Sequence, residues 1–164
     1  MELIHVLIII IIFLGFAFLH YVLPKIYKKG HKKRAISKFY KYYRKYLSNG
    51  TLALGGIFSN IVTLDSEKVK IGKYVFNLNE IQDIKFYIYS YYPYNKNDNS
   101  FPRSRAYIYI TNNAGEELRC LDICSGISTF ISFVLVLKFI LMQGTNYDQS
   151  DLEKLLCECE KTEK

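Results

Sequence analysis

The chain opens with an almost unbroken run of apolar residues. Residues 3–23 read LIHVLIIIIIFLGFAFLHYVL, with no charge and with only His5 and His20 as clearly polar positions. A helix of about twenty residues covers roughly 30 Å, the thickness of the hydrocarbon core of a bilayer. A cleaved signal peptide would carry a basic start and a small-residue cleavage site, whereas this start carries Glu2 and the run ends in YVLP. Residues 1–24 are therefore predicted to form an uncleaved transmembrane anchor.

Residues 25–49 keep a helical period but become strongly basic. On a helical wheel the apolar and aromatic residues gather on one arc, and the basic residues gather on the opposite arc. We expect a basic amphipathic helix at the membrane surface, and two interpretations stay open. The aromatic arc can pack on the domain that follows, or the cations can bind anionic lipid headgroups. The apolar arc holds Ile36, Phe39, Tyr40, Tyr43 and Leu47, and the candidate lipid contacts are Lys38, Lys41, Arg44 and Lys45.

From Gly50 onward the period becomes that of β-strands. Short apolar or alternating runs recur between turn residues, which predicts about seven strands within residues 50–143. A polar tract with two prolines, YYPYNKNDNSFPRSR, is expected to be the one long loop. The seven runs read TLALGG, NIVTLD, KVKIG, YVFNL, IQDIKFYIYSYY, RAYIYITN and ELRCLDI.

Two of the predicted strands place tyrosines on one face. Alternation puts Tyr87 and Tyr89 on one face of the first strand and Phe86 and Ile88 on the other face. In the next run, Tyr107 and Tyr109 share a face in the same way. Neighbouring strands of this kind are expected to stack their tyrosines as cross-strand pairs. The result is either a ladder that stabilises the sheet or a face for a protein partner, because tyrosine is over-represented at interfaces. The candidate partner face comprises Tyr87, Tyr89, Tyr107 and Tyr109.

A second apolar segment follows the last strand. Residues 123–142 carry one charge, Lys138, and several hydroxyl side chains. We interpret residues 127–142 as a helix that caps the sheet, because a lysine inside a span costs roughly 2 to 3 kcal/mol and the hydroxyls dilute the hydrophobicity. A second membrane span is the alternative. Residues 144–164 are expected to form an acidic tail with a short helix at LEKLLCECEK.

Seven short strands followed by one amphipathic helix is the order of elements in pleckstrin-homology-like (PH-like) barrels. The stretch KVKIGKYVFNLNEIQDIKFYIY is similar to the central hairpin of small bacterial membrane-anchored members of that superfamily. The resemblance covers residues 50–143 and implies a mainly β fold with flanking helices, in which a seven-stranded barrel that binds lipid headgroups or peptides is capped by a C-terminal helix. The loop around Ser59 and Asn60 has no Lys or Arg, so we place the lipid contact in the basic flank instead.

The charge is distributed unevenly. Residues 1–50 contain ten basic residues and Glu2, giving +9, whereas residues 51–164 contain twelve basic and fourteen acidic residues, giving −2. Positive charge next to a span marks its cytoplasmic side, so the C-terminal domain is expected in the cytoplasm. Aromatic residues interleaved with basic ones can also stack nucleic-acid bases. Anchoring in a membrane makes nucleic acid a less expected partner.

Few residues in the predicted globule support catalysis. All three histidines lie in the anchor or its flank, and no phosphate-binding glycine-rich motif is present. Four cysteines, at positions 120, 124, 157 and 159, could in principle hold zinc, but their spacing is atypical. We expect a buried Cys120, partly exposed Cys157 and Cys159, and no cofactor or metal.

These patterns favour a non-catalytic, single-pass binding or scaffolding module that faces the cytoplasm, with the membrane and a protein as partners. Two alternatives stay open. One is a two-span protein that serves as subunit of a larger membrane complex, and the other is a membrane-bound enzyme of unrecognised type.

Overall fold

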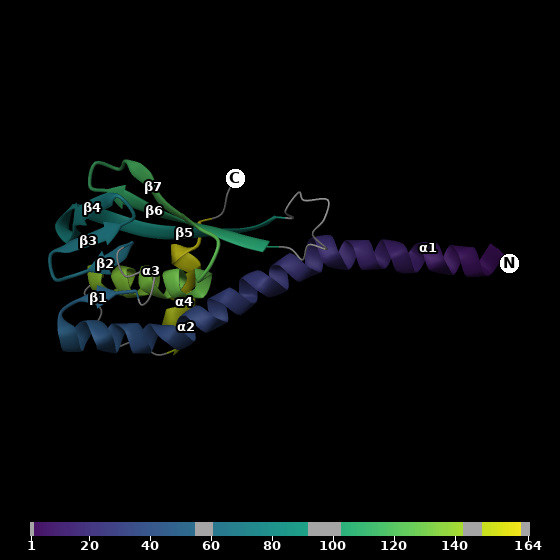
Figure 1. The fold of residues 1–164 in the computed structure, drawn as a ribbon, viewed down its shortest axis with the longest axis horizontal. Helices are drawn as coiled ribbons and strands as arrows, with labels where there is room; N and C mark the ends of the chain where they lie inside the picture. The colour runs from purple at the N-terminus through teal and green to yellow at the C-terminus, as the bar shows by residue number, and fades with distance from the viewer. Residues whose placement is uncertain (1, 55–60, 92–102, 143–148, 162–164) are drawn as a thin grey trace.

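A long helical rod forms the N-terminal part of the protein. The computed structural model describes residues 2–54, 61–91, 103–142 and 149–161. The rod comprises α1 (Glu2–Ala17), the π-helical turn η1 (Phe18–Val22) and α2 (Leu23–Asn49), which follow one another without an intervening loop. α2 ends where Gly50 takes up a left-handed conformation and its N–H donates to the Tyr46 carbonyl. Figure 1 shows α1 projecting away from the globule and α2 running along one side of it.

Seven strands follow, at the positions that the alternating runs predict. They form two antiparallel sheets, with strand orders β1-β2-β3-β4 and β5-β6-β7. The 3₁₀ turn η3 (Leu78–Glu80) joins the sheets, and Asn77 and Glu80 close it with a capping box. The strands are β1 (Leu52–Ala53), β2 (Val62–Leu64), β3 (Lys68–Ile71), β4 (Tyr74–Asn77), β5 (Ile81–Tyr91), β6 (Arg103–Asn112) and β7 (Glu117–Ile123).

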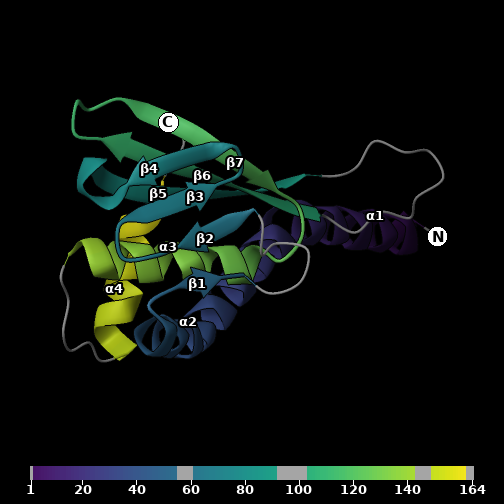
Figure 2. The same cartoon turned by 60° about the vertical axis from the view of Figure 1, so that its left-hand side comes forward.

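The expected closed barrel is not formed. Among the described residues, no ladder of backbone hydrogen bonds joins one sheet to the other. Helix α3 (Ile127–Leu141) lies beneath the sheets and α2 lies beneath α3, so the globule is layered (Figure 2). Because α3 fills the interior with apolar side chains, the core is buried by stacking layers rather than by closing a sheet. The loop around Ser59 and Asn60 and the central part of the long predicted loop, 92–102, lie outside the described residues.

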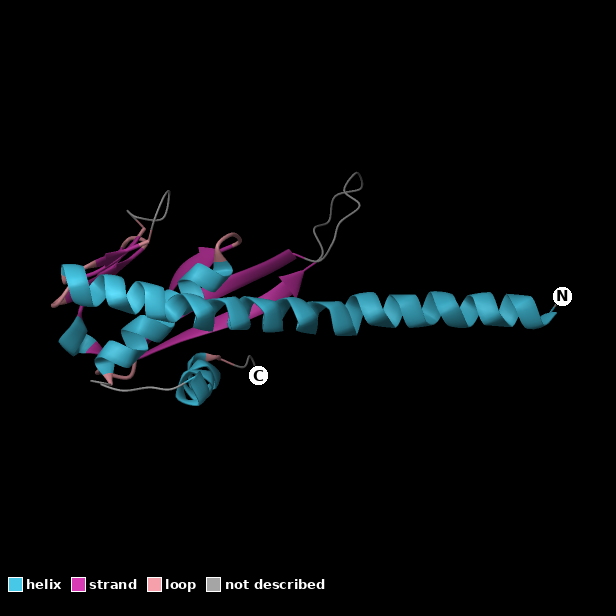
Figure 3. Cartoon of the chain, turned by 90° about the horizontal axis from the view of Figure 1, so that it is seen from below, coloured by secondary structure: helices cyan, strands magenta, loops and turns pink. Residues whose placement is uncertain are grey.

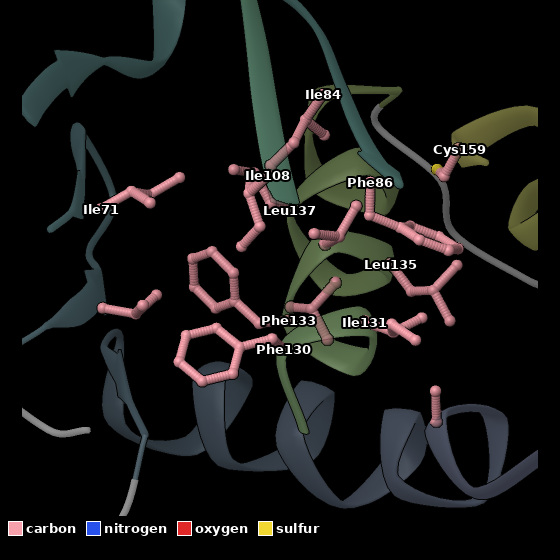
Figure 4. Close-up of a cluster of buried hydrophobic side chains, with 14 of the residues drawn as sticks. Ile71, Ile84, Phe86, Ile108, Phe130, Ile131, Phe133, Leu135, Leu137 and Cys159 are labelled. Carbon is pink, nitrogen blue, oxygen red and sulfur yellow. The ribbon is translucent and has the colours of Figure 1, made fainter. Parts of the chain in front are cut away.

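Helix α3 is the centre of the core, which confirms the predicted cap. Eleven of its fifteen residues are buried. Phe130 and Phe133 point toward Ile71 of the first sheet, as Figure 4 shows, while Leu135 lies on the side of α4. The helix contacts β5, β6, α2 and α4. A helix enclosed in this way has no face left for lipid.

The buried face of α2 differs from the arc that the helical wheel indicates. Ala35 and Phe39 are fully buried against α3, whereas Tyr40 and Leu47 are 40% and 63% exposed. Phe39 meets Phe139 edge to face, with ring centres 5.6 Å apart. Tyr42 and Tyr46, which are absent from the predicted arc, also pack against the core, so the buried stripe is rotated away from that arc. The aromatic side of this helix therefore belongs to the domain core.

The C-terminal segment closes one flank of the globule. Helix α4 (Gln149–Cys159) buries Leu152, Leu155, Leu156 and Cys159. Beyond it, Glu160 forms a parallel bridge with Phe86 at the edge of β5, and the Lys161 N–H donates to the Phe86 carbonyl at 2.8 Å. The short helix expected in the tail is confirmed, but the expected exposure of Cys159 is wrong. Its position on the inner face of α4 buries it completely.

Candidate functional site

The N-terminal helix has the properties of a membrane span. Within Ile4–Asn49, an apolar window has a mean hydropathy of 2.9 and no residue of it is buried. Phe13, for example, is 76% exposed. A core helix of the same composition would be covered by protein, and this one is not. One described helix is therefore long and apolar enough to cross a membrane, a property that a signal sequence near an N-terminus shares.

The continuous rod determines how far each basic residue lies from this span. At 1.5 Å per residue, Lys25 and Lys28 lie within about 8 Å of Leu23 along the helix axis. Lys38 lies about 22 Å and Lys45 about 33 Å beyond Leu23 on the same measure. The candidate lipid contacts are thus at the end of α2 that is distant from α1, and their role as lipid contacts stays a prediction.

Those four side chains also have different surroundings. Lys41, Arg44 and Lys45 are exposed. Lys38 is half-buried, and its Nζ donates to Thr129 Oγ1 at 2.9 Å and to Ser128 Oγ at 3.4 Å. Because both acceptors lie in the first turn of α3, Lys38 connects the two packed helices. On the helical wheel all four residues lie on the basic arc, so the sequence does not indicate that one of them has a structural role.

The tyrosines of β5 and β6 form the expected stacked face. Tyr87 lies directly opposite Tyr107 in the register of the two strands. The rings of Tyr89 and Tyr107 stack, with centres 5.3 Å apart and planes 13° apart. The Tyr107 hydroxyl donates to the Tyr89 hydroxyl at 2.9 Å. Along β5, Tyr87 also stacks on Tyr89, with ring centres 6.2 Å apart, and Tyr91 follows in a tilted arrangement 5.9 Å from Tyr89.

Cations cover this tyrosine face, a feature that sequence reasoning missed. The guanidinium carbon of Arg119 lies 3.3 Å from the centre of the Tyr107 ring, and Lys161 Nζ lies 4.3 Å from that of Tyr109. Such contacts stabilise by about 0.5 to 1 kcal/mol at exposed sites. Arg105 follows the same alternation as Tyr107, so its place on this face could have been inferred. Its guanidinium lies 5.4 Å from the Tyr91 ring centre and within 3.4 Å of Asp122.

The tyrosine face also meets the helical rod. Lys28 Nζ, in the first turns of α2, lies 5.7 Å from the centre of the Tyr87 ring. Figures 1 and 3 both show the β5–β6 hairpin running beside α2, with the end of β5 and the start of β6 directed toward α1. Tyr91 and Arg103 pair at that end of the two strands. The hairpin therefore brings aromatic and basic side chains back toward the candidate span.

The four cysteines are divided between buried and exposed positions. Burial raises the pKa of the Cys120 thiol to about 11 and that of Cys159 to about 12, so both are protonated at neutral pH. Cys124 and Cys157 are exposed. In the described ranges, no three His, Cys, Asp or Glu side chains gather in a way that could hold a metal ion.

Two surface hollows lie among the described residues. The larger one, of about 380 Å³, is lined by Ser66, Glu67 and the turn Asn77–Asn79. The second, of about 270 Å³, lies over Phe76, Glu80 and the β6–β7 turn. Neither of these two hollows is lined by a histidine or a cysteine.

The comparisons with known proteins place the chain in no family. It matches no protein-family model, and neither a curated protein nor a solved structure shows significant similarity to it.

Proposed function

We propose that this protein is a non-catalytic binding or scaffolding module that α1 anchors in a membrane, with the globule on the cytoplasmic side. The observation that carries the proposal is the continuity of the rod. An exposed apolar helix passes directly into α2, whose Ala35 and Phe39 are part of the domain core. An anchor built in this way holds the globule at a defined place beside the bilayer instead of on a flexible tether.

The orientation follows from the first turns of α2. Lys25, Lys29 and Lys33 are exposed and lie close to the apolar segment. Basic residues so near a span favour retention of their side in the cytoplasm. Because α1 crosses the bilayer once in this proposal, its N-terminal end lies on the opposite side from the globule. The basic flank then faces the inner leaflet, whose anionic headgroups attract it.

The architecture also supports a binding role. Four strands, three strands and a buried helix follow one another in the order that the PH-like resemblance implies, although the sheets stay open. We infer that the globule is a PH-like scaffold of this kind. Its stacked tyrosine face, with Tyr107 and Tyr109 under Arg119 and Lys161, offers a protein partner aromatic and basic contacts.

Native thiols allow the orientation to be tested without tags. Cys124 and Cys157 are the exposed cysteines of the globule. A maleimide that cannot cross membranes should leave them unlabelled in intact cells and label them after permeabilisation. Labelling in intact cells would place the globule outside and refute the proposed orientation. Recovery of the protein in the soluble fraction would refute the anchor.

A matched pair of variants tests the cause of the orientation. Replacing Lys25, Lys29 and Lys33 by Gln should raise the labelled fraction in intact cells. Replacing Lys41, Arg44 and Lys45 by Gln removes the same charge but at the far end of α2, where charge has less influence on topology. The second variant should orient like the natural protein.

A further inference from the structure

We propose that the end of the β5–β6 hairpin at Tyr91 and Arg103 contacts anionic phospholipid headgroups of the membrane that α1 spans. The inference rests on the proposed function, because it requires α1 to be in the bilayer. It adds a second contact with the membrane and assigns it to residues of the β domain. The tyrosine and basic side chains at this end would then fix how the globule is turned relative to the bilayer.

The position of the hairpin follows from its register with the rod. Lys28 Nζ lies 5.7 Å from the centre of the Tyr87 ring, which places the middle of β5 beside the first turns of α2. β5 continues from Tyr87 to Tyr91, and at about 3.3 Å per residue these four steps cover up to about 13 Å. Lys28 itself lies only about 8 Å beyond Leu23 along the helix.

The direction of the strand decides where that length leads. In Figures 1 and 3 the end of β5 and the start of β6 lie on the side of the globule from which α1 projects. The length of β5 beyond Tyr87 is therefore enough to bring Tyr91 and its partner Arg103 to the level at which the apolar segment ends. In a membrane, this is the level of the headgroups.

The side chains at this end suit a headgroup region. Tyrosine combines an apolar ring with a polar hydroxyl and is enriched where membrane meets water. The guanidinium of arginine matches phosphate oxygens with two parallel hydrogen bonds. Arg103 is exposed, and Arg105 lies over Tyr91 at 5.4 Å. Asp122 is the acid paired with Arg105, at 3.4 Å, so this end stays basic overall when Lys25 and Lys29 of α2 are included.

Distance separates this contact from the one that the sequence suggests. Lys41, Arg44 and Lys45 lie about 27 to 33 Å beyond Leu23 along the rod. Electrostatic attraction between exposed charges is largely screened beyond about 8 Å at physiological ionic strength. With α1 upright in the bilayer, these residues are too distant to hold lipid, whereas the hairpin end is not.

The absence of tryptophan from the sequence gives a direct test. Three full-length variants, Phe13→Trp, Tyr91→Trp and Leu47→Trp, each carry a single fluorophore. They are reconstituted in phosphatidylcholine vesicles with and without phosphatidylglycerol, using lipids brominated either near the headgroup or deep in the acyl chain. We expect deep bromine to quench Phe13→Trp and shallow bromine to quench Tyr91→Trp at least twofold more than Leu47→Trp. The shallow quenching should increase when phosphatidylglycerol is present.

The outcomes distinguish the two proposals. Loss of deep quenching in Phe13→Trp would refute the anchor. Normal quenching there, with Tyr91→Trp no more quenched than Leu47→Trp, would overturn the hairpin contact alone. Adding Arg103→Gln and Arg105→Gln to Tyr91→Trp should reduce its shallow quenching to the level seen in pure phosphatidylcholine. Unchanged quenching in that variant, with circular dichroism showing the native fold, would overturn recognition of the anionic headgroup.

Discussion

Lys138 of α3 forms an ion pair with Asp83 of β5 at the margin of the core. Both side chains are largely covered, with 18% and 23% of their surfaces exposed. Lys138 is the one charge in the second apolar segment, and it argued against a membrane span there. The structure gives that lysine a protein partner, as a helix in the core of a globule requires.

The pair should make a measurable contribution to stability. Asp83→Asn leaves Lys138 largely covered without its ion-pair partner, and Lys138→Met leaves Asp83 with only the more exposed Lys85. Each substitution should lower the free energy of unfolding by about 1 to 3 kcal/mol. The double variant should lose less than the sum of the two. Urea denaturation of the full-length protein in detergent would measure this coupling.

Lys85 supplies the control for that experiment. Its Nζ lies 3.4 Å from the other carboxylate oxygen of Asp83, but its side chain is 39% exposed. Exposed pairs contribute about 0 to 1 kcal/mol. Lys85→Met should therefore have little effect, and a loss equal to that of Lys138→Met would show that burial is not what matters here.

The burial of α2 residues leads to a second prediction. Phe39 is fully buried and Leu47 is 63% exposed, although both lie on the arc that the helical wheel marks as apolar. Phe39→Ala should lower the free energy of unfolding by about 3 to 5 kcal/mol. Leu47→Ala should change it by less than about 0.5 kcal/mol. Equal losses would mean that the original arc packs on the core.

The same contacts define the folding unit. A chain that begins at Lys25 keeps α2 over α3 and should fold, as seen by dispersed NMR spectra. A chain that begins at Gly50 exposes the α3 surface that Ala35 and Phe39 cover, so it should aggregate or stay unfolded. A well-folded monomer from Gly50 would show that α2 is not part of the folding unit.

The sequence predicts local elements well because alternation and helical period are local signals. All seven strands, α3 and α4 lie where those patterns put them, and the stacking of Tyr89 on Tyr107 follows from the same alternation. The arrangement of the two sheets depends on long-range packing around α3, which no local pattern contains. The phase of α2 was wrong because the predicted arc left out Tyr42 and Tyr46, which pack on the core, and included Tyr40 and Leu47, which are exposed.

In the candidate site, too, the features set by local alternation could be predicted and those set by long-range packing could not. Tyrosines and arginines on a common strand face can be read from the spacing of two residues, as with Arg105 and Tyr107. That Lys28 meets Tyr87, or that Lys38 meets Thr129, depends on how α2 packs against the rest of the globule. The distances of the basic residues from the span are fixed because α1 and α2 form one continuous helical rod, and the sequence pattern alone does not show that continuity.

The four thiols should fall into two reactivity classes. Cys124 and Cys157 are exposed, whereas Cys120 and Cys159 are buried. At pH 8, a maleimide should modify two thiols rapidly in the native protein and all four in urea. Mass spectrometry of the digested protein would identify the sites. Rapid native labelling of Cys159 would contradict the position of α4.

Cys159 should also make stability depend on alkaline pH. Burial raises its pKa from 9.0 to about 12, so the folded state holds the thiol proton more tightly than the unfolded state. This contribution is fully present below pH 9 and is lost as the pH rises from about 9 to 12. Cys159→Ala should lower stability at pH 7 and show a shallower decline over that window. Parallel declines would assign the pH dependence to other groups, such as the buried Cys120 thiol, whose pKa is raised to about 11.

Lys38 and Lys41 provide the sharpest separation between structure and lipid binding in the basic helix. Lys38 donates to Thr129 and Ser128, whereas Lys41 is exposed. Lys38→Met leaves two hydroxyls without their donor and removes two hydrogen bonds made by a charged group, so we expect a loss of about 1 to 3 kcal/mol in the free energy of unfolding. Lys41→Met should be neutral. Neither substitution should alter the weak shallow quenching of full-length Leu47→Trp in vesicles containing phosphatidylglycerol, because α1 holds both residues far from the headgroups. If Lys41→Met weakened that quenching while leaving stability unchanged, α2 would have to lie along the membrane surface, and the lipid contact predicted from the sequence would be correct.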